Sequence, residues 1–257
     1  LGTTVRRVLV SPIGKLAYVP FSTLLDSRDV VYVPSATAYA LLREDPFEPG
    51  EGVLALGDPV YNAKPPNAGP SRLRAGRLTA LPGTRAEVKS IATVPLLGEE
   101  ATEADFAKAV EQRERWRAVH FACHGLVDTE RPLLSSLAIT PDDEGDGFLT
   151  VAEILRMKIP ADLVALSACE TGKGRVYASE GVVGFTRAFL FAGTPRVIVS
   201  LWKVDDEATR ALMTKFYELW KTKPAATALR EAQRHVASQE KWADPHYWAA
   251  WQLWGLP

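Results

Sequence analysis

Cysteine, histidine and methionine are scarce in this sequence, which has two cysteines, four histidines and two methionines among 257 residues. Two cysteines, Cys123 and Cys169, are too few for the disulfide framework of a small secreted domain. Their separation also does not match the spacing of ligands in structural zinc sites. The scarcity therefore excludes a disulfide-stapled fold and leaves a free thiol available for chemistry.

Neither sign of charge is in excess, because 30 Lys and Arg residues face 31 Asp and Glu residues. Direct nucleic-acid binding depends on a clustered basic face, so we do not expect it here. The apolar runs VIVSLW and LVALSAC are far shorter than the roughly 18 residues that a membrane span needs, and no secretory signal opens the chain. These absences predict a soluble, cytoplasmic protein. Because the first residue is Leu1 rather than Met, we expect a fragment or a processed product.

What is present is the composition of a globular domain, with 47% hydrophobic and 24% charged residues. A break rich in Pro and Gly, EDPFEPGEG at residues 44–52, marks the best domain boundary. We expect residues 1–48 to form an accessory element, the remnant of a longer upstream region, and residues 49–257 to form the main domain. Within the accessory element, KLAYVPF and DVVYVPS have the Tyr, Val and Phe content of short strands.

After residue 51, apolar runs alternate with helical patterns, which predicts a layered α/β domain with a parallel sheet. The expected strands are VLALGDP, VPLLGEE, AVHFACHG, DLVALSAC and RVIVSLW. Helix starts are predicted where Thr precedes an acidic residue by three positions, as in a capping box; these pairs are Thr84 with Glu87, Thr102 with Asp105, and Thr150 with Glu153. Residues 206–221 have one apolar face at helical spacing.

Two of the expected strands end in residues that can do chemistry. AVHFACHG ends in His124 and Gly125, and DLVALSAC ends in Cys169. Ligands and catalysis gather beyond the carboxyl ends of parallel strands, so an imidazole and a thiol can meet there for nucleophilic catalysis. The N–H groups of Gly125 and Cys169 can stabilise a developing oxyanion. A buried, inert Cys169 remains the alternative from the residues alone.

A metal centre is not expected at His120, Cys123 and His124. Residues three apart on a strand point to opposite faces, and the chain has no further group of ligands to complete a zinc site.

Several spaced motifs resemble the CHAT domain, a caspase-like family whose broader group includes caspases, separase and gingipains. They are VHFACHG, DGFLTVAEIL, the long run from LSACETGKG to LWKVDD, and the closing HYWAAWQLWG. The resemblance implies a three-layer sandwich with a mostly parallel six-stranded sheet and helices on both faces. It also implies a cysteine endopeptidase that acts on protein substrates without a cofactor, with His124 and Cys169 as the dyad. His120 is then a buried, hydrogen-bonded strand residue, and Cys123 stands where many relatives have Thr.

The resemblance further implies a pocket for the residue before the cleaved bond. Asp205 or Asp206 can pair with a substrate Arg or Lys, and Trp202 can form a wall; Asp205 can equally cap the following helix. Lys203, where separase has Asp, departs from a simple preference for basic residues.

The loop after Cys169 carries Lys173 and Arg175 as possible self-cleavage sites, although a plain strand-to-helix turn is the preferred interpretation. We interpret the acidic stretch at residues 141–147 as a solvated hairpin rather than a calcium loop, and the late tryptophans as core residues.

Such domains often follow helical repeats, so we expect an upstream helical-repeat or sensor region, or an activating partner. A catalytically weak scaffold in a signalling or defence complex is the main alternative function. A thiol hydrolase or acyl transferase that acts on small molecules is a weaker one, since no Gly-rich phosphate-binding fingerprint is present.

Overall fold

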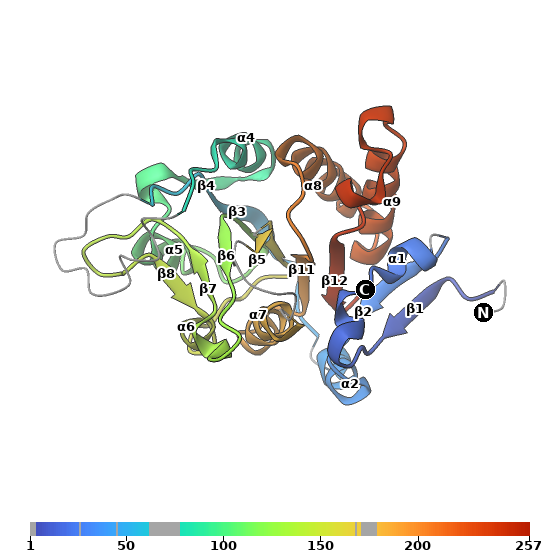
Figure 1. Ribbon diagram of the computed structural model, residues 1–257. Helices are drawn as coiled ribbons and strands as arrows, with labels where there is room; N and C mark the ends of the chain where they lie inside the picture. Colours follow the sequence, from blue (N-terminus) through green and yellow to red (C-terminus); the bar gives the residue numbers. More distant parts are fainter. Residues whose placement is uncertain (1–3, 26, 45, 62–77, 168, 171–178) are drawn as a thin grey trace.

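Figure 1 shows the computed structural model of the chain, which describes residues 4–25, 27–44, 46–61, 78–167, 169–170 and 179–257. The described strands form an eight-stranded sheet, in the order β1-β2-β12-β11-β9-β5-β3-β4, and a four-stranded sheet, in the order β10-β6-β7-β8. Their bounds are β1 Arg7–Val10, β2 Asp29–Tyr32, β3 Glu51–Gly57, β4 Val94–Leu97, β5 Trp116–Ala122, β6 His124–Leu126, β7 Ser136–Ala138, β8 Phe148–Thr150, β9 Val164–Leu166, β10 Cys169–Glu170, β11 Arg196–Ser200 and β12 Trp251–Gly255.

The large sheet is parallel throughout except where β11 pairs with β12. The α/β class and the mostly parallel sheet are therefore confirmed. Residues 49–257 supply six described strands of this sheet, as expected, and β1 and β2, from the first 48 residues, extend it beyond β12 to eight. The sequence did not predict that β1 and β2 join this sheet, because such pairing depends on which edge strand remains unpaired after the rest of the sheet has formed.

Helices cover both faces of this sheet, which gives the expected three layers (Figure 1). One face packs against α1, α5, α6 and α7 through side chains such as Phe106, Ile154 and Phe189. The other packs against α8 and α9 through Phe216, Trp220 and their neighbours. The helix bounds are α1 Phe21–Leu24, α2 Ala36–Glu44, α4 Pro82–Ile91, α5 Glu103–Val110, α6 Val151–Ile154, α7 Ser179–Phe191, α8 Asp206–Trp220 and α9 Ala225–Ala237.

Two of the three predicted helix starts are confirmed. Thr102 caps α5 by accepting the backbone N–H of Asp105, and Thr150 forms a complete capping box with Glu153 on α6. The prediction at Thr84 is wrong, because Pro82 begins α4 and Leu81 is its N-cap residue. The Thr84 hydroxyl bonds instead to Leu81 O and to the N–H of Asp58.

The N-terminal segment differs from its prediction at KLAYVPF. Residues Gly14–Tyr18 form a 3₁₀ helix, and α1 follows Pro20 directly. The strand lies earlier, at β1, while DVVYVPS is a strand as expected. The Tyr32 hydroxyl donates to Val19 O at 2.8 Å and accepts the Phe21 N–H at 2.9 Å. Tyr32 of β2 thus provides hydrogen-bond partners for two backbone groups in the turn between the two short helices. Local strand propensity cannot predict such a long-range contact.

Two further predictions hold near the acidic stretch and the chain end. Residues 141–147 connect the antiparallel strands β7 and β8, so they form the tip of a hairpin. Trp251 and Trp254 of β12 are fully buried, Trp242 is buried, and Trp248 is partly buried, which agrees with a role in the core.

Candidate active site

The site is built where two neighbouring parallel strands end. In the large sheet, β5 and β9 pair with Phe121 opposite Leu166. Three residues further along each strand, His124 begins β6 and Cys169 begins β10, and these two residues are direct partners in a second parallel pairing. The number of residues from Phe121 to His124 equals the number from Leu166 to Cys169, so the register of the large sheet continues into the small sheet. The backbones of His124 and Cys169 therefore lie side by side beyond the ends of β5 and β9.

The imidazole of His124 is held by a backbone carbonyl. The residue is only 4% exposed, and Nε2 lies 2.8 Å from Thr79 O. A carbonyl oxygen only accepts hydrogen bonds, so Nε2 carries a proton and donates it. In the neutral imidazole, Nδ1 is then the basic nitrogen and remains for proton transfer.

Tyr61, just after β3, contacts the same histidine from another direction. Its hydroxyl accepts the backbone N–H of His124 at 3.3 Å. The two rings are tilted against one another, with centroids 5.2 Å apart. Burial raises the pKa of Tyr61, so its hydroxyl stays protonated. Tyr61 and Thr79 could not be identified as partners of His124 from the sequence, because these contacts are long-range.

The pKa of His124 lies below its ordinary value, chiefly because burial disfavours the imidazolium. The bond to Thr79 O opposes this shift, the nearby Lys203 ammonium adds to it, and the Asp206 carboxylate opposes it. His124 is therefore neutral at pH 7, in the form that accepts a proton.

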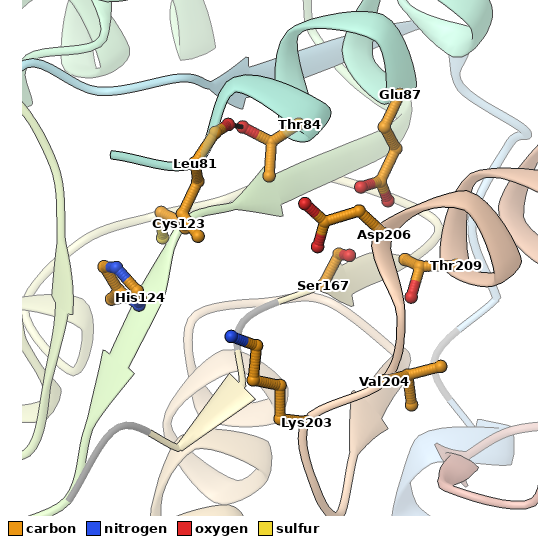
Figure 2. Close-up of a pocket in the computed structure, with 10 residues that line it drawn as sticks. All are labelled: Leu81, Thr84, Glu87, Cys123, His124, Ser167, Lys203, Val204, Asp206 and Thr209. Atoms are coloured by element: carbon orange, nitrogen blue, oxygen red, sulfur yellow. Dashed lines mark hydrogen bonds between the residues drawn. The ribbon is translucent and has the colours of Figure 1, made fainter. Parts of the chain in front are cut away.

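A small cavity of about 30 Å³ opens beside His124. Figure 2 shows its walls, with Lys203 pointing from the segment before α8 toward His124 and Asp206. The lining residues are Leu81, Thr84, Glu87, Cys123, His124, Ser167, Lys203, Val204, Asp206 and Thr209. Two carboxylates and one ammonium thus surround the same space.

The two carboxylates are in different environments. Glu87 is 2% exposed, and its Oε1 lies 3.0 Å from Nε2 of the fully buried His120. His120 Nδ1 lies 3.3 Å from the Tyr217 hydroxyl, which confirms the buried, hydrogen-bonded role expected for this histidine. The pKa of Asp206 is raised, first by burial and next by the charge of Glu87. Glu87 was expected to cap a helix, and nothing in the sequence indicates that it lines the cavity.

The other predicted pocket residues lie differently. Asp205 is exposed and caps α8, accepting the N–H groups of Glu207 and Ala208 at 3.1 and 3.0 Å. The Trp202 indole donates to His246 O at 2.9 Å and stacks on the His246 ring, so its contacts are outside the set of residues that line the cavity. Of the three, Asp206 alone belongs to that set. Lys173 and Arg175 lie outside the described residues.

Gly125 follows His124 in β6 and pairs with Glu170 of β10 on one side and with Leu137 of β7 on the other. Its backbone is therefore next to that of the β10 strand.

Across the described residues, no group of three or more His, Cys, Asp or Glu side chains is arranged to hold a metal ion. No helix in that same part of the chain is long and apolar enough to cross a membrane.

The fold is that of the caspase-like cysteine peptidases. Separase from Saccharomyces cerevisiae, in its complex with securin, superposes with a TM-score of 0.58 at 14% identity, over 97% of this chain and 15% of that one. The Arg-specific cysteine proteinase gingipain R gives a TM-score of 0.53 at 12% identity, over 95% and 56% of the two chains. At these identities the likeness concerns the fold alone.

Within that class, the chain belongs to the CHAT domain family, whose model matches residues 1–256. Two curated relatives are tetratricopeptide repeat proteins 28. The Homo sapiens protein is 28% identical over 309 aligned positions, 97% of this chain and 12% of that protein. The Mus musculus protein is 31% identical over 200 positions, 63% and 8% respectively. The chain thus spans a small part of the relatives it matches.

Proposed function

We propose that this chain is a cysteine endopeptidase in which Cys169 is the nucleophile and His124 transfers the proton. The observation that carries the proposal is the direct backbone pairing of these two residues in β10 and β6. The family and the fold of the caspase-like peptidases support it. The dyad is the feature that a scaffold without proteolysis does not need.

In the proposed reaction, the Cys169 sulfur attacks the carbonyl carbon of the scissile peptide bond, and its proton passes through His124 Nδ1 to the leaving amine. The C–N bond breaks and a thioester remains. Water then attacks the thioester, gives one proton to Nδ1, and releases the acid and the thiol. The bond from Nε2 to Thr79 O supports this assignment of Nδ1. The N–H groups of Gly125 and Cys169 would stabilise the oxyanion.

The proposed substrate residue before the cleaved bond is basic. Glu87 and Asp206 supply two carboxylates to the cavity, and Lys203 supplies one opposing charge. The cavity of about 30 Å³ holds a single water but not a long side chain. Lys203 is exposed and can swing toward solvent, so a substrate Arg or Lys would replace its ammonium beside Asp206. Self-cleavage after Lys173 or Arg175 would follow the same preference.

The wider context is also a proposal. The relatives are named for tetratricopeptide repeats, which supports a helical-repeat or sensor region as the partner that regulates this site. We also propose that residues 1–48 form an accessory element and residues 49–257 the peptidase domain.

A peptide library, with fragments identified by mass spectrometry, tests the activity. Wild type should cleave, and Cys169→Ala and His124→Ala should not. His235→Ala, an exposed histidine on α9, is the matched control and should cleave like wild type. Cleavage that survives in Cys169→Ala would refute the assignment. Absence of cleavage by the wild type, with and without a repeat-containing partner, would favour the catalytically weak scaffold instead.

A further inference from the structure

Tyr61 is the buried group that contacts both the backbone and the ring of His124. The residue is 5% exposed, its hydroxyl accepts the His124 N–H at 3.3 Å, and its ring lies 5.2 Å from the imidazole. The tyrosine packs with Ala138 and Phe148 of the small sheet, beside Leu78 and Leu126. Its position is therefore fixed by the same sheet that carries His124.

A tyrosine whose role is packing alone would not need a hydrogen bond between its hydroxyl and the backbone of His124. The N–H of His124 is a backbone donor in the interior, where an unmatched donor costs free energy. Tyr61 satisfies this donor from outside the sheet, while its ring shields one side of the imidazole from water. Thr79 O holds Nε2 of the same imidazole at 2.8 Å. Backbone, ring and Nε2 of His124 are thus all fixed.

We propose that Tyr61 is a positioning residue that holds His124 in the orientation in which Nδ1 is presented to the reacting groups. This inference rests on the proposed peptidase function for its kinetic consequences, but the position of the imidazole can be measured without any substrate. Tyr61 acts through His124 and touches no reacting atom.

Two variants separate the hydroxyl from the ring. Tyr61→Phe keeps the ring and removes the acceptor of the His124 N–H, and Tyr61→Leu removes both. Tyr32→Phe is the control, because the hydroxyl of the buried Tyr32 also accepts a backbone N–H, that of Phe21 at 2.9 Å. Tyr32 lies on β2, with β12, β11 and β9 between it and β5. A general effect of losing such a bond would appear equally in the control.

The first measurement is the pKa of His124 by NMR titration, with its signals assigned from their loss in His124→Gln. Ionisable groups around the imidazole and the cavity beside it are Lys203 and Asp206 from the segment at the start of α8, Glu87 from α4, Tyr61 after β3, and Cys123 between β5 and β6. All except Tyr61 are kept in each variant. Tyr61→Leu should raise the pKa of His124 toward its ordinary value, since water reaches the ring. Tyr32→Phe should leave it unchanged.

The second measurement is peptide cleavage. Tyr61→Phe should lower kcat about tenfold at nearly constant KM, as expected when a proton-transfer group is misplaced, and Tyr61→Leu should lower it further. Urea unfolding shows that each variant is folded. An unchanged His124 pKa in Tyr61→Leu, with kcat in both Tyr61 variants equal to that of Tyr32→Phe, would overturn the inference. If the wild type cleaves nothing, the proposed function fails, and the NMR titration alone still decides the role of Tyr61.

Discussion

His124 and Cys169 lie opposite one another in the parallel pairing of β6 and β10, and these two strands of the small sheet follow β5 and β9 of the large sheet. The pairing continues the register of β5 and β9, where Phe121 lies opposite Leu166. A residue inserted after either strand would shift one partner along the other. The geometry of the site therefore depends on equal lengths of chain between the two sheets.

The two neighbouring histidines should respond differently to removal. His120→Ala leaves Glu87 and the Tyr217 hydroxyl without their buried partner, so we expect it to lower the free energy of unfolding by about 3 kcal/mol. His124→Ala loses the bond to Thr79 O and should cost about 1 kcal/mol, while abolishing cleavage. Urea unfolding of both variants measures the difference. A larger destabilisation by His124→Ala would contradict this division between structure and catalysis.

The stability of the protein should depend on pH through Glu103. This residue begins α5, and its Oε1 is buried with no hydrogen-bond partner among the described residues. Burial, and then the charges of Glu153, Asp146 and Asp142, raise its pKa to about 7. In the unfolded chain the Glu103 carboxyl has its ordinary pKa of about 4.5. Between that pH and about 7, the folded state therefore holds a proton that the unfolded chain has released. Stability from this group is present at low pH and is lost as pH rises toward and through 7.

Glu103→Gln tests this dependence, because the amide cannot ionise. The variant should be more stable than wild type at pH 8, and the difference should shrink at pH 5. Asp105→Asn, at a more exposed carboxylate on the same helix, is the control for replacing a carboxylate by an amide. Urea unfolding at both pH values is the measurement. Equal effects of Glu103→Gln at pH 5 and pH 8 would show that Glu103 is ionised in the folded protein across that range.

The acid limb of the activity profile should lie below pH 6.5. His124 must be neutral to accept a proton, and its pKa is lowered from 6.5, chiefly by burial. The pH at which cleavage has fallen to half of its maximum should therefore lie below 6.5. Lys203→Gln removes a charge that lowers the pKa of His124, so it should move the limb to higher pH. If the acid limb of Lys203→Gln lies at the same pH as that of the wild type, Lys203 does not lower the pKa of His124.

Adjacent aspartates should have separate roles. Asp205→Ala removes the cap of α8 and should cost about 1 kcal/mol of stability without changing substrate preference. Asp206→Asn should weaken the preference for Arg or Lys before the cleaved bond, and Lys203→Gln should strengthen it. The ratios of kcat/KM for matched peptides with Arg, Gln or Glu at that position give the answer. A loss of preference in Asp205→Ala, with none in Asp206→Asn, would reverse the assignment.

Residues 1–48 should be needed for stability as well as for any upstream connection. The Tyr32 ring stacks on Trp254 with centroids 5.4 Å apart, and the Gln252 amide donates to Ala17 O at 3.0 Å. A chain that starts at residue 49 would expose Trp254 and the open edge of β12, so we expect a lower Tm and aggregation. Gln252→Ala should have a much smaller effect. A truncated chain as stable as the full one would establish residues 49–257 as a self-sufficient domain.

The sequence by itself determined the layered class, most strands and the two residues of the candidate dyad. The strands β5 and β9 could be predicted from continuous apolar runs, because strands of a parallel sheet that is covered on both faces are buried along their length. The ends of those runs at His124 and Cys169 follow from the same pattern. Local capping was also readable at Thr102 and Thr150, where the bonds span three residues.

Only the tertiary structure decided which long-range groups surround these positions. Glu87 has the spacing of a capping residue after Thr84, yet it pairs with His120 because α4 packs over β5. Asp205 and Asp206 are indistinguishable in the sequence, and the helix start turns one toward its own backbone and the other toward the cavity. Tyr61 and Thr79 reach His124 through space, and no local pattern encodes contacts that form only when separate strands and loops pack together.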